Sequence, residues 1–118
     1  QSRERPRDAR IPYHGWIDNC IVLVARTPEF RSSFVIGCPS AYQRFLLGQE
    51  FEIRDAREDS LGVLKTSETN IYGFYKFFGQ YAAEEGDLLV IRFDIATQTA
   101  HLSLESESKV IEMFDNDD

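Results

Sequence analysis

The sequence predicts a mostly β domain with two short helices, arranged as a small barrel of several short strands. Short apolar or alternating segments recur between polar turns, as expected for strands. Two other segments place apolar residues at helical spacing. The chain has 118 residues, of which 42% are hydrophobic, so one domain can bury its own core.

Six strands are expected from the pattern of apolar residues. Residues 20–25 and 88–93 are almost continuously apolar, which is typical of buried strands, whereas 50–55 alternate between apolar and polar side chains. The predicted strands are 19–25, 33–37, 50–55, 61–65, 88–94 and 99–104, and 109–114 are a candidate for a last edge strand. The last two of the six form a hairpin with a turn near 96–98.

Two short helices are expected between the strands, near 41–47 and 73–81. Ser40 can cap the first of them. In the second, four aromatic residues share one face: Phe74, Phe77, Phe78 and Tyr81. We predict that this face packs into the core, with a base-stacking platform as the alternative. Tyr72 and Tyr75 lie off the face and are expected to be exposed.

The net charge of −7 is concentrated towards the C-terminal end of the chain. Residues 105–118 carry a net −5 from six acidic side chains and Lys109, and we interpret them as an acidic tail that is solvated or competes for a basic face. Residues 1–17 are interpreted as a flexible basic arm and lead-in, because the first ten include four arginines. That arm is either a disordered end or a contact to DNA phosphates. The barrel domain is placed at 18–104.

The two cysteines are too few for a disulfide framework. Cys20 and Cys38 each lie in or beside an apolar strand, so both are predicted to be buried, reduced thiols, with one disulfide between neighbouring strands as the alternative. No apolar run approaches the roughly 20 residues that span a bilayer. No signal-peptide pattern is visible. We expect an intracellular protein without a membrane partner, nuclear in a eukaryote or cytoplasmic in a bacterium.

Motifs for catalysis and metal binding are absent from the sequence. His14 and His101 are far apart, and His101 is predicted to face solvent from the last hairpin strand. Residues 115–118 lack the glycine and the terminal glutamate of a calcium-binding loop. We therefore predict that the domain is not an enzyme and uses no cofactor and no metal. An enzyme would require the histidines or some carboxylates to converge in a pocket.

Two polar loops contain side chains suited to nucleic-acid binding. The first loop, 26–33, contains Arg26, Arg31, Ser32 and Ser33, and the second loop, 65–70, contains Lys65, Thr66, Ser67 and Asn70. Arginine can bind guanine edges and asparagine can bind adenine edges, while lysine, serine and threonine commonly reach phosphates. Ordinary solvated loops are the alternative interpretation. If both loops lie at one end of the barrel, they form a pincer.

The segment from Gly73 to Asp87, followed by an apolar strand, resembles the B-three DNA-binding domain of plant auxin response factors and abscisic-acid-insensitive regulators. Upstream, the strand, polar loop, second strand, helix and third strand occur in the order that this family has, so the resemblance covers roughly 20–104. The chain departs from the family at Phe74, where the signature has Trp, and at Ala83, where it has Leu. Pro39 is also displaced relative to the usual Ile-Pro. The same pseudobarrel occurs as the recognition domain of some bacterial restriction endonucleases.

The resemblance implies an open seven-stranded DNA-binding pseudobarrel whose two arms enter the major groove. By position, those arms are the two polar loops. We therefore expect sequence-specific binding of double-stranded DNA, as a module of a transcription regulator or restriction-type protein. The expected DNA-binding residues are Arg26, Arg31, Ser32, Ser33, Lys65, Thr66, Ser67, Asn70 and Lys76, with further phosphate contacts from Arg54 or Arg57. The alternative, favoured by the acidic charge, is a protein-interaction or oligomerisation barrel that does not bind DNA.

Overall fold

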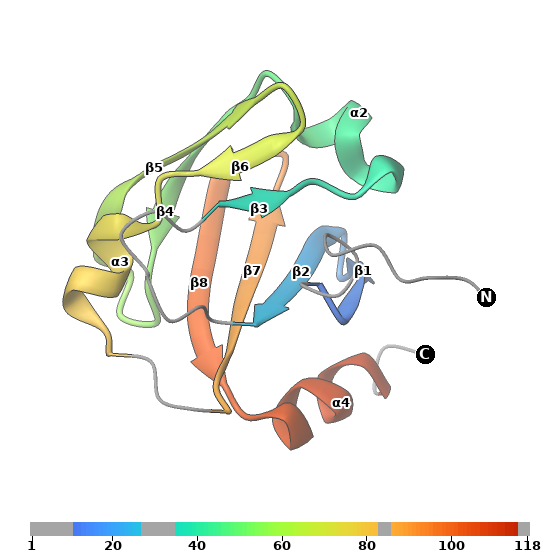
Figure 1. The fold of residues 1–118 in the computed structure, drawn as a ribbon, viewed down its shortest axis with the longest axis vertical. Coiled ribbons are helices and arrows are strands. Elements are labelled where there is room, and N and C mark those ends of the chain that lie inside the picture. The colour runs from blue at the N-terminus through green and yellow to red at the C-terminus, as the bar shows by residue number, and fades with distance from the viewer. Residues whose placement is uncertain (1–10, 27–34, 83–85, 116–118) are drawn as a thin grey trace.

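The computed structural model of the chain describes residues 11–26, 35–82 and 86–115, which form one curled sheet with short helices around it (Figure 1). The strands are β1 (Tyr13–Ile17), β2 (Cys20–Arg26), β3 (Ile36–Gly37), β4 (Glu50–Arg54), β5 (Ser60–Ser67), β6 (Asn70–Tyr72), β7 (Leu88–Asp94) and β8 (Thr99–Glu105). The helical elements are the 3-10 turn η1 (Ser40–Tyr42) and the α-helices α2 (Gln43–Leu46), α3 (Tyr75–Gln80) and α4 (Glu107–Asp115). The mostly β fold class is confirmed, but the described residues form eight strands rather than seven and three α-helices rather than two.

The sheet is open, with the strand order β1-β2-β7-β8-β4-β5-β6-β3. Neighbouring strands are antiparallel except β4 and β8, which run parallel. β1 and β3 are the edges, and aromatic contacts connect β1 to the segment that follows β3. Trp16 packs edge-on against Phe45 with 5.1 Å between ring centroids, and His14 Nδ1 lies 2.8 Å from the Tyr42 hydroxyl. Side-chain packing therefore ties the two sides of the open sheet together where no strand pairing does so among the described residues.

The main core lies on the concave face of the sheet. Ile21 and Leu23 of β2 and Ile91 and Phe93 of β7 are all fully buried in it. Phe51 of β4 packs edge-on against Phe93, with 5.0 Å between ring centroids. Alternate residues of each strand thus point to the same interior, as the period of two requires.

The aromatic face predicted for 73–81 belongs to this core. Phe74 and Phe77 are each 1% exposed, and Phe78 and Tyr81 pack against them while partly buried. The helix is shorter than predicted, because α3 begins only at Tyr75, after a glycine whose φ is +113°. Tyr75 points away from the core and is 65% exposed, as its position off the aromatic face predicts.

A second apolar cluster lies on the convex face of β2 and β7, beneath α4 (Figure 1). Its buried members are Ile17, Val22, Val24, Leu88, Val90 and Val110. Both faces of β2 and β7 are therefore covered, which explains why their sequences are almost continuously apolar.

The predicted last strand at 109–114 is wrong, because these residues lie in helix α4. Val110, Met113 and Phe114 fall at i, i+3 and i+4, so they share the face that meets the convex cluster. Ser106, directly before the helix, accepts a hydrogen bond at Oγ from the Lys109 amide, with 3.4 Å between donor and acceptor. In the described part of the chain, no helix has the length and apolar character to cross a membrane.

The lead-in predicted at 1–17 contains strand β1, which was not predicted from the sequence. The two-residue turn between β1 and β2 is Asp18-Asn19, and both residues have positive φ, 53° and 67°. Paired positive φ values are those of a type I′ hairpin turn, for which aspartate and asparagine are favourable. Asn19, predicted to begin a strand, therefore belongs to the turn.

The polar loop predicted at 65–70 is a tight hairpin. β5 continues to Ser67 and β6 begins at Asn70, so only Glu68 and Thr69 form the turn. The Thr66 hydroxyl accepts a hydrogen bond from the Gly48 amide at 2.7 Å and donates to the Leu46 carbonyl at 3.1 Å. These bonds attach the hairpin to the end of α2 and extend the strand beyond the predicted 61–65.

Both cysteines are free thiols, so the alternative of a disulfide between them is wrong. Cys38 is buried, as predicted, and burial raises its pKa to about 11. Cys20 is only partly buried, at the start of β2, and burial also raises its pKa.

Candidate nucleic-acid interface

The β5–β6 hairpin presents one exposed polar face. In its register, Lys65 lies opposite Tyr72, and Ser67 lies opposite Asn70. All four residues are exposed, whereas the alternating Ile71 is fully buried in the core. The hairpin is therefore a two-stranded ribbon whose inner face is fixed by packing and whose outer face is free.

Thr66 does not belong to this face. It pairs with the buried Ile71, and its hydroxyl is hydrogen-bonded to the Gly48 amide and the Leu46 carbonyl. Three of the four DNA-contacting residues predicted for the second loop thus share one surface, and Thr66 has a structural role. Because side chains alternate between the two faces of a strand, Thr66 points inward while Lys65 and Ser67 point outward.

Lys65 and Lys76 are exposed cations without an ion pair among the described residues. Lys76, on α3, extends its aliphatic stem over β5: a Cβ on Gly62 would lie 3.3 Å from its Cδ. Both lysines therefore lie along β5. Glu50 is the cross-strand neighbour of Lys65, so this surface has both signs of charge rather than a uniform positive field.

The first predicted loop is only partly described. Arg26 is the exposed last residue of β2, and residues 27–34, which include Arg31, Ser32 and Ser33, lie outside the described residues. Arg26 pairs with Leu88, the first residue of β7, and Leu88 pairs with Glu105, the last residue of β8.

The two predicted loops start from opposite ends of the sheet. β4 runs parallel to β8 and ends beside Ser60, the first residue of β5. The end of the sheet that holds Arg26 is therefore the end where β5 begins, and the turn after Ser67 lies at the other end (Figure 1). Arg26 and the turn after Ser67 therefore do not meet the condition for a pincer, which requires both loops at one end of the barrel.

Arg54 and Arg57 already have local partners. Arg54 lies 3.1 Å from Glu52 and donates to the Glu58 carbonyl at 2.8 Å. Arg57 lies 4.0 Å from Asp59. A phosphate contact by either arginine would have to compete with these interactions.

The buried carboxylate of Asp55, which was not predicted from the sequence, organises the turn between β4 and β5. Asp55 is 1% exposed, and its oxygens accept hydrogen bonds from the amides of Arg57 and Asp59, both at 2.9 Å, and from the Tyr81 hydroxyl. The Tyr81 hydrogen bond is the main reason why the pKa of Asp55 is lowered. The same bond raises the pKa of Tyr81. Only an aspartate directly before a turn could have hinted at this role.

The two histidines occupy separate places and have different partners. His14 contacts Tyr42, and His101 lies 3.4 Å from Glu58 on the convex face. Among the residues that the structure describes, no group of three or more histidine, cysteine, aspartate or glutamate side chains could hold a metal ion.

Comparison with models of known protein families, with curated proteins and with solved structures finds no match to this chain. Its function is therefore inferred from its own residues and their arrangement.

Proposed function

We propose that the chain binds double-stranded DNA by placing the outer face of the β5–β6 hairpin in the major groove. The main support is that Lys65, Ser67 and Asn70 lie exposed on one face of a two-stranded ribbon. A two-stranded β-ribbon is one of the elements that the major groove admits. The packed inner face holds the ribbon rigid, so its outer side chains can approach base edges without a large loss of entropy.

Each side chain has a role that fits its chemistry. Asn70 can bind an adenine edge with both ends of its amide, and Lys65 can neutralise a phosphate. Ser67 can contact either. Lys76 adds a phosphate contact along β5, and Arg26 adds one from the opposite end of the sheet. Arg31, Ser32 and Ser33 stay predicted contacts and lie outside the described residues. The module then belongs to a transcription regulator or a restriction-type protein, as the resemblance implies.

Fluorescence anisotropy against a pool of randomised duplexes tests the proposal. Lys65→Ala and Arg31→Ala should weaken binding to all sequences and each reduce the slope of log K against log salt by about one. Lys109→Ala removes the same charge from α4 and should change little. If no duplex binds at low salt, or both variants bind like the parent, the proposal is wrong.

Asn70→Ala tests sequence readout separately from affinity. If Asn70 contacts an adenine, its loss should cost about 1–3 kcal/mol on the preferred duplex and relax specificity at one position. Uniform weakening across all duplexes would show instead that Asn70 contacts only the backbone.

A protein-interaction or oligomerisation barrel is the second candidate, and one observation favours it. Trp16 is 44% exposed on the edge strand β1, whose five residues carry no Asp, Glu, Lys or Arg. Exposed edge strands without charges tend to pair with another strand. Light scattering after gel filtration would show a dimer that Trp16→Ala disrupts and that Tyr75→Ala, a more exposed aromatic away from the edge, leaves intact. A monomer at high concentration would rule out self-association.

A further inference from the structure

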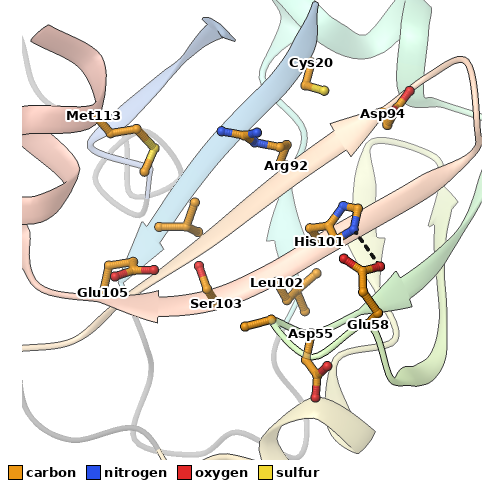
Figure 2. A pocket seen from close by; sticks show the side chains of 12 residues that line it. Cys20, Asp55, Glu58, Arg92, Asp94, His101, Leu102, Ser103, Glu105 and Met113 are labelled. Atoms are coloured by element: carbon orange, nitrogen blue, oxygen red, sulfur yellow. Dashed lines mark hydrogen bonds and ion pairs between the residues drawn. The ribbon is translucent and has the colours of Figure 1, made fainter. Parts of the chain in front are cut away.

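A hollow of about 510 Å³ lies on the convex face of β7 and β8, between α4 and the turn that joins β4 to β5 (Figure 2). Ligand sites in proteins measure roughly 300–1,000 Å³, so the hollow is large enough for a small molecule. It is formed by other strands than the β5–β6 hairpin, and its use would be independent of DNA binding. Arg92, Ser103 and Glu105 project into it from the two strands, and Met113 lines it from α4.

Most charged groups of the hollow are already paired. Asp55 accepts hydrogen bonds from the turn and from Tyr81. Glu58 contacts His101. Asp94 accepts hydrogen bonds from the amides of Ala96 and Thr97. Arg92 and Glu105 make no hydrogen bond or ion pair through their side chains with a described residue, although both are partly buried. The hollow is left with one available cation and one available carboxylate.

The register of β7 and β8 sets the spacing of these two charges. Arg92 pairs with His101, Val90 pairs with Ser103, and Leu88 pairs with Glu105. Arg92 and Glu105 therefore lie two rows apart, which corresponds to about 13 Å along the strands. Both side chains are long and can lean towards each other, so the remaining gap suits an extended molecule of two or three residues, about 7–10 Å long.

The row between the two charges is bordered by apolar side chains. Val90 is 4% exposed, and Met113 packs against the convex cluster beside it. In Figure 2, the Arg92 side chain extends from β7 towards the side of the hollow where Met113 lies. Methionine adapts its shape to different apolar partners. A ligand that lies along this row would meet opposite charges at its ends and an apolar wall in between.

We propose that the hollow binds a short zwitterionic peptide with apolar side chains. Its C-terminal carboxylate pairs with the Arg92 guanidinium, and its N-terminal ammonium pairs with the Glu105 carboxylate. A phosphate is a poorer fit, because Glu58, Asp94 and Glu105 surround the hollow with negative charge. A simple amine is also poorer, because it leaves Arg92 without a partner.

Titration calorimetry with the tripeptide Leu-Gly-Leu tests the proposal. The N-acetylated and the C-amidated forms of the same peptide should each bind at least about tenfold more weakly, because each loses one charge-assisted contact. Arg92→Gln and Glu105→Gln should weaken the free peptide by a similar factor. Arg57→Gln and Glu112→Gln, exposed residues outside the hollow, remove the same charges and should have no effect.

Cys20 supplies a second measurement, because its side chain borders the hollow near Arg92. Bound Leu-Gly-Leu should slow alkylation of Cys20. Lys65→Ala should leave that protection unchanged, because Lys65 lies on the β5–β6 hairpin and does not line the hollow. No binding of the free peptide at 10 mM, about the limit of useful affinity, would overturn the proposal. Equal binding of free and capped peptides, or of the parent and the Arg92→Gln variant, would overturn it as well.

Discussion

The β2–β7 pair and the β5–β6 hairpin are two antiparallel pairs of one sheet with opposite surroundings. β2 and β7 are apolar on both faces, because the concave core takes one face and α4 covers the other. The β5–β6 hairpin is buried on its inner face only, and its outer face consists of exposed polar side chains and Tyr72. The contrast indicates that the first pair holds the fold together while the second is free to bind a partner.

The largest expected effect comes from a polar residue in the helix that covers the β2–β7 pair. Val110 of α4 is fully buried against β2 and β7, so Val110→Asn should destabilise the protein by about 4 kcal/mol through lost apolar burial and an unsatisfied amide. Val63 lies 41% exposed on β5, and Val63→Asn should cost less than about 1 kcal/mol. Urea unfolding of both variants measures the difference. Equal losses would show that the outer face of β5 is also covered.

A somewhat smaller loss is expected where the hairpin joins α3. Gly73 has φ +113°, and a Cβ there would lie 2.4 Å from the carbonyl oxygen of Val63. Gly73→Ala should therefore destabilise the fold by about 3 kcal/mol. Gly79, in α3, has open space around it, and Gly79→Ala should stabilise the helix by about 0.5–1 kcal/mol. Thermal unfolding distinguishes the two, and a tolerated Gly73→Ala would contradict this backbone geometry.

Acid should weaken the turn between β4 and β5, where Asp55 lies. The Tyr81 hydroxyl lowers the pKa of Asp55 in the folded state, so its carboxylate contributes stability above the ordinary pKa of aspartate. That contribution is lost as the pH falls below about 4 towards the lowered pKa. Urea unfolding should be measured between pH 6 and pH 2.5, roughly the range over which carboxylates titrate. The free energy of unfolding should fall more steeply with acid in the parent than in Asp55→Asn. Asp59→Asn, which keeps the backbone hydrogen bonds, should behave like the parent.

The smallest effect is chemical and leaves the fold intact. Cys38 is 1% exposed, and burial raises its pKa to about 11, so the native protein should react there at least about tenfold more slowly than the unfolded chain. Cys20 is partly exposed and should be alkylated first. Peptide mapping after brief treatment with iodoacetamide checks the order. Modification of Cys38 before Cys20 would contradict the burial of the segment after β3.

Sequence patterns predicted the interior better than the surface. The continuous apolar runs identified β2 and β7 correctly, and helical spacing placed Phe74 and Phe77 in the core. The same reasoning could not identify α4, because Val110 and Ile111 followed by Met113 and Phe114 fit a short strand as well as a helix. What favours the helix is a tertiary contact: α4 covers Val22 and Val24 on the convex face of β2.

The candidate site was predictable in composition but not in form. The polar residues at 65–70 suggested a loop, whereas all of them except Glu68 and Thr69 belong to two paired strands. The strand period then places Thr66 inward and Lys65 outward, which no loop prediction can do. Strand β1 was not predicted because its turn depends on positive φ values at Asp18 and Asn19. The role of Asp55 was not predicted because its partner Tyr81 is distant in the sequence.

The position of β2 also affects how the chain must fold during synthesis. β2 leaves the ribosome well before its inner neighbour β7, which begins only at Leu88. Until then, β1, with five residues, is the only described strand available to pair with β2, which is apolar on both faces. Such long-range pairing slows folding and exposes aggregation-prone surface. The barrel should therefore assemble in one late, cooperative step, and nascent chains that stop before β7 should depend on chaperones to stay soluble.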